Sequence, residues 1–160
     1  PAASGAVSVH FSAEAANMSS RSAGREVNVA QRAAELIVCH THPGDDATQC
    51  SSDAQGDAWF VVDLKGRLLT PTHYCFRGDL GSDQQIRTWE LQGSVDAQSW
   101  TTLRAHVDDT SVARDRCGSW PIGAHRDHAF SQFRIIVGAG APQLCCSGFE
   151  VYGRVAGIMR

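Results

Sequence analysis

The chain has 160 residues, of which 42% are apolar and 19% are charged, and its formal net charge is −3. These values are typical of one globular domain and exclude a disordered tail. The basic residues are almost all single arginines, so no basic run follows a nucleic-acid backbone. No apolar stretch approaches the ~20 residues of a membrane span. We therefore expect neither a nucleic-acid partner nor a membrane span.

The first third of the chain has the weakest pattern. Val7, Val9 and Phe11 alternate with polar residues, which predicts a short strand. Residues 29–39 are compatible with a short helix that runs into a strand. Residues 40–57 are rich in glycine, aspartate and serine and predict a loop.

From residue 59 onward the chain reads as short strands separated by turns. The predicted strands are Trp59–Leu64, Leu68–Phe76, Ile86–Ser94, Trp100–His106, Phe133–Val137 and Phe149–Val151. Pro71 within the second strand marks an edge or a bulge, because proline has no N–H for a ladder bond. Residues 95–99 predict a hairpin turn, across which Trp89 and Trp100 are expected to point inward together. This spacing predicts one all-β domain, a sandwich or barrel, over residues 1–160.

Several fragments, taken in order, carry a family resemblance. They are AWFVVDL (58–64), HYCFRGD (73–79), WELQGSVDAQSWTTL (89–103), HVDDTSV (106–112), SWPI (119–122), FRIIV (133–137) and CCSGFEVYG (145–153). Together they resemble the discoidin-like domains, also called coagulation-factor C-type and galactose-binding-like, of HECT-type ubiquitin ligases and BTB-domain adaptor proteins. The resemblance covers nearly the whole chain.

The resemblance implies a jelly-roll β-sandwich of about eight strands, in which two sheets pack face to face and loops at one end bind a ligand. It implies a non-catalytic recognition module of a ubiquitin-pathway or adaptor protein, with a protein or peptide as partner and a small ligand or glycan as alternatives. Phe149, Val151 and Tyr152 are expected to place the last strand beside the first. Since the chain begins at Pro1, we expect it to be a piece of a larger protein.

The cysteine pattern separates this hypothesis from its main alternative. The chain has six cysteines but lacks the terminal pair that closes the secreted relatives, and Cys145 and Cys146 are adjacent, so only a strained bond could join them. We therefore predict reduced thiols and an intracellular, cytoplasmic location. The alternative is a carbohydrate-binding module of a secreted or surface protein, which predicts disulfides and bound calcium.

The candidate ligand-binding residues are polar or aromatic side chains close to strand ends. They are His40, Arg77, Asp79, Arg87, Arg104, His106 and Trp120. Arg77 has two interpretations: its guanidinium grips an anionic group of the ligand, or it pairs with Asp79 and pins the loop.

Metal binding and catalysis are both disfavoured by the pattern. Cys39, His40, His42 and Cys50 are zinc-ligand types, but their spacing matches no common zinc site. Another cluster, Asp45, Asp46, Asp53 and Asp57, lies in the same loop, where some galactose-binding-type sandwiches bind calcium, but it forms no EF-hand loop and a solvated polar loop is favoured. Asp108 and Asp109 beside His106 are predicted to cap a turn, and no catalytic motif is present. We expect no metal, no cofactor and no enzyme activity.

Overall fold

The computed structural model describes residues 7–12, 16–17, 48–51, 57–78, 86–112, 117–138 and 143–159. The strands in this part of the chain, in sequence order, are β1 (Ser8–Phe11), β2 (Ala16–Asn17), β3 (Thr48–Ser51), β4 (Ala58–Asp63), β5 (Arg67–Arg77), β6 (Trp89–Ser94), β7 (Thr101–His106), β8 (Cys117–Pro121), β9 (Gln132–Val137), β10 (Gln143–Cys146) and β11 (Gly148–Ile158). The helix expected within residues 29–39 lies outside the described residues.

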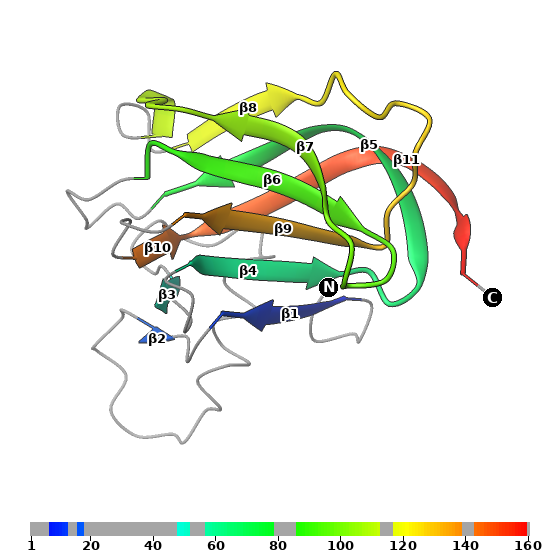
Figure 1. Ribbon diagram of the computed structural model, residues 1–160, viewed down its shortest axis with the longest axis horizontal. Coiled ribbons are helices and arrows are strands. Elements are labelled where there is room, and N and C mark those ends of the chain that lie inside the picture. Colours follow the sequence, from blue (N-terminus) through cyan, green and yellow to red (C-terminus); the bar gives the residue numbers. More distant parts are fainter. Residues whose placement is uncertain are drawn as a thin grey trace.

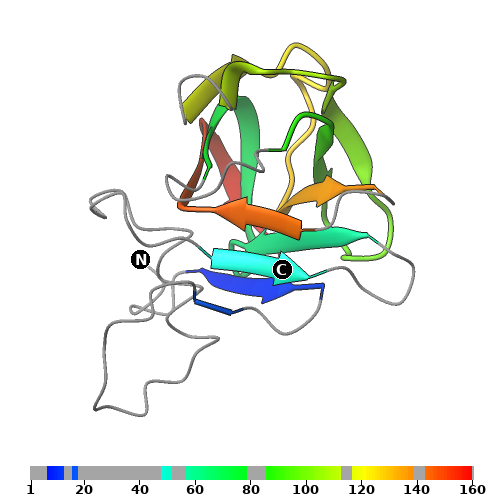
Figure 2. The same cartoon turned by 90° about the vertical axis from the view of Figure 1, so that its left-hand side faces the viewer.

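The described strands form a β-sandwich with a small additional sheet. One large sheet has the order β1-β4-β9-β6-β7, and the facing sheet has the order β11-β5-β8. These two sheets together contain eight strands, and they lie against each other in Figures 1 and 2. The short strands β10-β3-β2 form a third sheet at one end, on the left in Figure 1. The all-β sandwich expected from the sequence is therefore confirmed.

Alternating apolar residues explain why the two sheets pack. In β4, β6 and β9 every second side chain points into the space between the sheets, and Phe60, Leu91 and Ile135 are fully buried there. The facing sheet contributes Tyr74, Phe76 and Phe149, and the rings of Phe60 and Phe149 meet edge to face with centroids 5.5 Å apart. A core of this composition supplies most of the stabilisation of a sandwich.

Two local predictions agree with the backbone. Residues 95–99 form the turn between β6 and β7, where the Ser94 hydroxyl and the Asp96 carboxylate accept hydrogen bonds from successive backbone N–H groups. The register of β5 with β11 shifts between the Tyr152–His73 pair and the Gly153–Pro71 pair. Pro71 therefore lies at a bulge, as its missing N–H predicts.

Some predictions were wrong. Residues 48–51 fall in the predicted loop but form β3, paired with β10. The last strand, β11, pairs with β5, whereas β1 pairs with β4. Trp100 is only half-buried and lies beneath the Arg134 guanidinium, 4.2 Å from its ring centroid, so it does not share the core with Trp89. The residue opposite Trp89 is His106, because a register shift after Leu91 displaces the rest of the hairpin.

Candidate functional site

Four strands place candidate residues at the same end of the sandwich. At this end β5 finishes at Arg77 and β7 finishes at His106, while β6 and β11 begin; it is on the left in Figure 1. We call it the loop end and define it by Arg77, Arg87 and residues 106–109. His40 and Asp79, also predicted as site residues, lie outside the described residues.

His106 forms the centre of a buried hydrogen-bonded chain at the loop end. Its ring stacks on Trp89 with centroids 4.0 Å apart, and only 4% of the residue is exposed. The Trp89 Nε1–H donates to the Tyr74 hydroxyl over 3.0 Å, and that hydroxyl lies 2.7 Å from His106 Nε2. Because the Tyr74 oxygen accepts from Trp89, its own proton is directed at Nε2. His106 Nδ1 then donates to Asp109 Oδ2 over 2.6 Å.

The electrostatics of this chain favour a neutral imidazole beside a charged carboxylate. Burial lowers the pKa of His106 below its usual value and outweighs the hydrogen bond that His106 donates to the Asp109 carboxylate, which acts in the opposite direction. Burial alone would raise the pKa of Asp109, but hydrogen bonds from Ser111 and His106 outweigh it and lower that pKa to about 2. Burial raises the pKa of the Tyr74 phenol well above its usual value, so this group stays protonated.

Asp109 caps the turn that follows β7. Its Oδ1 accepts a 2.9 Å hydrogen bond from the Ser111 N–H and another from the Ser111 hydroxyl. Its own N–H donates to the Arg87 carbonyl over 2.8 Å, which ties the turn to the segment before β6. The capped turn predicted here is confirmed. Tyr74 and His106 are buried, so the Asp109 carboxylate is the part of this hydrogen-bonded chain that reaches the surface.

Trp120 and Arg104 join the facing edges of the two large sheets. Trp120, on β8, is 8% exposed and packs edge-on against the rings of Trp89 and His106, with centroids 5.4 and 4.8 Å away. Arg104, on β7, donates from Nη1 to the Pro121 carbonyl over 2.7 Å. The sequence-predicted residues His106, Arg104 and Trp120 are therefore brought together, and all three engage neighbouring parts of the domain.

Arg87 and residues 107–108 form the exposed part of the loop end. Arg87 Nη1 lies 3.3 Å from Asp108 Oδ1, and both side chains are largely exposed. Val107 is 81% exposed, although the chain on either side of it is anchored by His106 and by an Asp108 N–H to Thr88 hydroxyl bond of 3.2 Å. The turn thus presents an apolar side chain and an ion pair on a fixed backbone.

Arg77 lies at the end of β5 on the outer face of the three-stranded sheet. Its Nη1 is 2.9 Å from Glu150 Oε1 on β11, and its side chain is 27% exposed. The guanidinium covers Gly148, where a Cβ would come within 2.1 Å of Nη2. Arg77 therefore braces the β5–β11 pair, and its acidic neighbour in the described part of the chain is Glu150.

Most residues of the predicted zinc and calcium clusters lie outside the described residues: Cys39, His40, His42, Asp45, Asp46 and Asp53. Within the described residues no group of three or more histidine, cysteine or acidic side chains is placed to hold a metal. No helix in this part of the chain has the length and apolar character of a membrane span.

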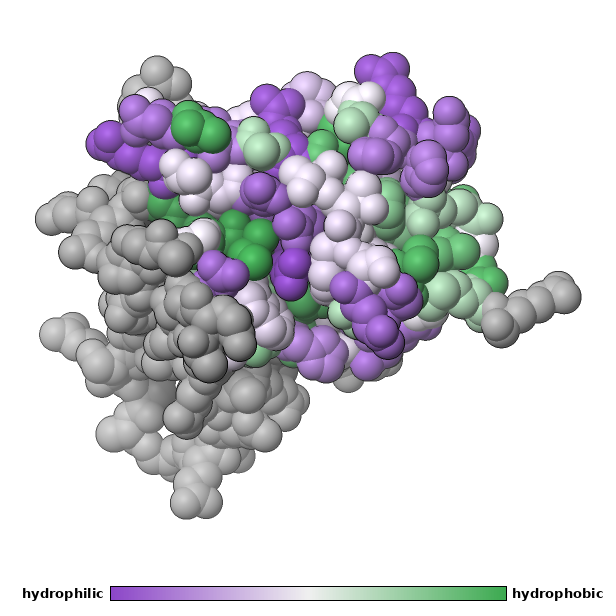
Figure 3. Space-filling view, viewed as in Figure 1, coloured by the Kyte–Doolittle hydropathy of each residue, from purple (hydrophilic) through white to green (hydrophobic). Residues whose placement is uncertain are grey.

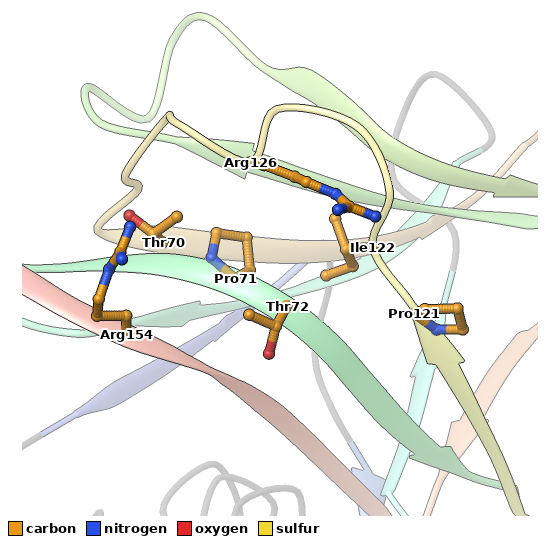
Figure 4. Close-up of a pocket in the computed structure, with 7 residues that line it drawn as sticks. All are labelled: Thr70, Pro71, Thr72, Pro121, Ile122, Arg126 and Arg154. Carbon is orange, nitrogen blue, oxygen red and sulfur yellow. The ribbon is translucent and has the colours of Figure 1, made fainter.

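A groove that the sequence did not suggest lies away from the loop end. It has a volume of about 400 Å³ and is lined by Thr70–Thr72, Pro121, Ile122, Arg126 and Arg154. Figure 4 shows Arg154 rising from β11 on one side of β5 and Arg126 coming from the loop after β8 on the other. We call this the β5 groove. Its residues come from distant parts of the chain, so no local motif could have revealed it.

Relatives in sequence come from ubiquitin ligases and a BTB protein. The chain is 38% identical over 118 residues to E3 ubiquitin-protein ligase Ufd4 of Drosophila melanogaster, a match covering 68% of this chain and 4% of the ligase. It is 32% identical to E3 ubiquitin-protein ligase hecd-1 of Caenorhabditis elegans, over 85% of this chain and 5% of the ligase. A BTB/POZ domain-containing protein of Arabidopsis thaliana is 34% identical, over 63% of this chain and 14% of that protein. No protein-family model matches the chain.

Solved structures that superpose on this chain show the same fold. An F5/8 type C domain from Bacteroides fragilis superposes with a TM-score of 0.61 at 16% identity, covering 94% of this chain and 93% of that domain. The lectin domain of lectinolysin, complexed with Lewis B antigen, has a TM-score of 0.57 at 15% identity, covering 89% and 93%. The fold is therefore that of a galactose-binding-like, F5/8 type C sandwich domain.

The sequence relatives make this class more specific. The chain has the galactose-binding-like fold and is homologous to segments of the ligases Ufd4 and hecd-1 and of the BTB protein. The chain spans only 4%, 5% and 14% of the length of these three relatives.

Proposed function

We propose that the domain is a non-catalytic recognition module that binds a protein partner through the loop end, within an intracellular ubiquitin-pathway or adaptor protein. The observation that carries the proposal is the anchored turn at residues 107–109. Asp109, His106 and Arg87 hold its backbone, while Val107 and the Arg87–Asp108 pair face solvent. A fixed loop that exposes apolar and charged groups loses little conformational entropy on binding.

The candidate residues divide into two roles in this proposal. Arg87 contacts an acidic or hydrogen-bonding group of the partner directly, because it is exposed and its ion pair with Asp108 is easily exchanged. His106, Arg104 and Trp120 act beneath it by holding the turn and the sheet edges in place. Arg77 keeps the start of β11 in register through Glu150.

The intracellular location is supported by the relatives and by the thiols. Two of the sequence relatives, Ufd4 and hecd-1, are E3 ubiquitin-protein ligases. Cys75, Cys117 and Cys146 are free thiols, and Cys117 is exposed. Persistent exposed thiols are typical of reducing compartments.

A comparison of charge variants tests the loop end. Wild-type domain, Arg87→Gln and Lys65→Gln are immobilised and incubated with cell lysate, and retained proteins are identified by mass spectrometry. Lys65 lies in the turn between β4 and β5, so its loss removes one positive charge at the other end of the domain. We expect a specific partner to be lost with Arg87→Gln and kept with Lys65→Gln. Equal retention by all three proteins would contradict the proposal.

A carbohydrate ligand is the second candidate, because two solved structures of this fold are complexes with glycans, one with Lewis B antigen and the other with GalNAc-β-1,3-galactose. A glycan array probed with and without calcium tests it. Calcium-dependent binding to a defined glycan, without any retained protein, would favour the carbohydrate-binding alternative.

A further inference from the structure

We propose that the β5 groove is a second binding site, which takes an extended acidic peptide segment with an aliphatic side chain between two carboxylates. In this arrangement the aliphatic side chain lies on Pro71 and Ile122, and the carboxylates meet Arg126 and Arg154. The site goes beyond the recognition function proposed for the loop end and does not depend on it.

The floor of the groove is apolar because its backbone and side-chain polar groups already form hydrogen bonds within the domain. Pro71 and Pro121 have no N–H, and the Thr72 carbonyl accepts the Ile122 N–H over 2.8 Å. The Thr72 hydroxyl donates to the Tyr152 carbonyl over 3.2 Å. The bulge in β5 interrupts the regular ladder with β11 at this point, where Thr70–Thr72 line the groove. A ligand therefore meets a preformed apolar floor, on which an aliphatic side chain loses contact with water.

The rim of the groove carries positive charge in a chain whose net charge is −3. Arg154 and Arg126 are exposed and approach the groove from opposite sides (Figure 4). Arg126 is steadied by a 3.3 Å hydrogen bond from Nε to the Gly123 carbonyl, which leaves its terminal nitrogens for another acceptor. Among the described residues, no carboxylate pairs with either arginine, and the lining contains no acidic side chain. A planar guanidinium matches a carboxylate in two parallel hydrogen bonds.

The lining favours a peptide over a sugar or a nucleic acid. A pyranose ring packs its C–H face on a flat aromatic side chain, and the described residues lining the groove include none. Single-stranded nucleic acid requires stacking rings and a longer basic track. An extended peptide needs only an apolar contact flanked by charge partners, which this groove offers.

Binding of labelled peptides tests the proposal by fluorescence anisotropy. The probe is a set of short peptides in which two glutamates flank a leucine, isoleucine or valine at varied spacing, with matched peptides carrying glutamine instead. We expect at least one acidic peptide to bind more tightly than its glutamine match, and less tightly as salt rises. Arg154→Gln and Arg126→Gln should each weaken that binding about tenfold, since a charge-assisted hydrogen bond is lost. Arg154→Lys should retain part of it, because the charge stays and the planar fork is lost.

Two control variants locate the bound peptide. Lys65→Gln removes one positive charge elsewhere and should leave the affinity unchanged. Arg87→Gln alters the loop end and should also leave it unchanged, which separates this site from the one proposed there. Both arginines of the groove are exposed, so their variants should melt like the wild type.

Several outcomes would overturn the proposal. One is that no acidic peptide in the set binds better than its glutamine match. Another is that affinity falls with Arg87→Gln but not with Arg154→Gln, which would place the peptide at the loop end. A third is that an acidic disaccharide binds the wild type while no peptide does, and that this binding is lost in Arg154→Gln and Arg126→Gln. That result would show that the occupant is a glycan.

Discussion

His106 is a buried side chain that connects the aromatic core to the turn at residues 107–109. Its ring is stacked on Trp89 like a core aromatic, while its two nitrogens connect the Tyr74 hydroxyl to the Asp109 carboxylate. Each polar atom of this chain has a partner, which removes the cost of burying it. The arrangement requires the neutral imidazole, because a protonated ring would direct a second N–H at the proton of Tyr74.

The preference for neutral His106 predicts a stability that depends on pH. In the unfolded chain this histidine binds a proton near pH 6.5, whereas in the folded domain its pKa is lower. The unfolded state therefore holds more protons below about pH 6.5. The contribution of neutral His106 to the free energy of unfolding is complete above that pH and is lost as the pH falls below it. The free energy of unfolding then decreases by at most about 1.4 kcal/mol per pH unit, because one proton is involved.

Urea unfolding between pH 7.5 and pH 5 measures this effect. His106→Gln should flatten the pH dependence, while His128→Gln, at an exposed position, should preserve it. The contribution of Asp109 lies in a separate window, because its pKa falls from 3.8 to about 2 on folding and its stabilisation is lost only below about pH 4. A wild-type stability that is constant down to pH 5 would show that His106 is not held neutral.

The thiols predict a clear order of chemical modification. Burial raises the pKa of Cys146 to about 12 and keeps it from solvent, whereas Cys117 is exposed on β8 with a pKa raised more modestly by partial burial. Brief alkylation of the native protein at pH 8 should label Cys117 and spare Cys146, and labelling in urea should reach both. Peptide mapping by mass spectrometry follows the two sites. Equal native labelling would mean that β10 opens readily.

At the scale of single elements, β11 depends on β5 for its position. Its ten paired residues run along β5 from Arg77 to Arg67 with two register shifts. From Tyr152, at the first shift, to Ala156 its residues are exposed, and Val155 and Ile158 are each 72% exposed. Figure 3 shows apolar side chains at the end of the molecule where β11 finishes. The buried half of the strand therefore supplies its packing energy.

Two glycines of β11 predict different sensitivity to a methyl group. A Cβ at Gly153 would lie 2.1 Å from the Thr70 carbonyl oxygen, which belongs to the backbone at the β5 bulge. A Cβ at Gly148 would meet only the end of the Arg77 side chain, which can move. We expect Gly153→Ala to lower the free energy of unfolding by about 1–3 kcal/mol through overpacking, and Gly148→Ala to cost clearly less. Denaturant unfolding of both variants measures the difference; the reverse order would contradict this explanation.

At the scale of the whole molecule, Trp89 connects the two sheets. It is 1% exposed on β6 and contacts the rings of Phe76 and Trp120 in the facing sheet, with centroids 6.3 and 5.4 Å away. Its indole N–H also donates to Tyr74 across the core. Loss of this side chain therefore weakens the contact between the layers as well as the sheet in which it lies.

Trp89→Ala should lower the free energy of unfolding by about 3–5 kcal/mol, as removal of a buried tryptophan does. Trp100→Ala is the matched control, because Trp100 is half-buried and its main contact is the Arg134 guanidinium. That contact is worth about 0.5–1 kcal/mol at an exposed site. Thermal and urea unfolding measure both variants, and equal losses would mean that the two rings are equally buried.

Much of the sandwich could be predicted from local patterns. Alternation of apolar and polar residues located β4, β7 and β9 within one residue, since a strand with one buried face must alternate, and it located the end of β6 but placed its start three residues early, at Ile86. Strand β8 was not predicted, because Trp120 is the one large apolar side chain among its five residues. Strands β3 and β10 were also missed, because they are short and their residues show no alternation of their own. Their pairing with each other stabilises them, and this contact spans most of the chain.

The sequence by itself determined the class of fold, because binary patterning and turn residues act over a few neighbouring positions. The pairing of β11 with β5, the half-exposure of Trp100 and the chain through Trp89, Tyr74, His106 and Asp109 were decided only by the tertiary structure. The β5 groove was decided there too, since its lining comes from β5, β8, β11 and a loop. Such features depend on register shifts and on contacts between distant segments, and neither leaves a signal in the local order of residues.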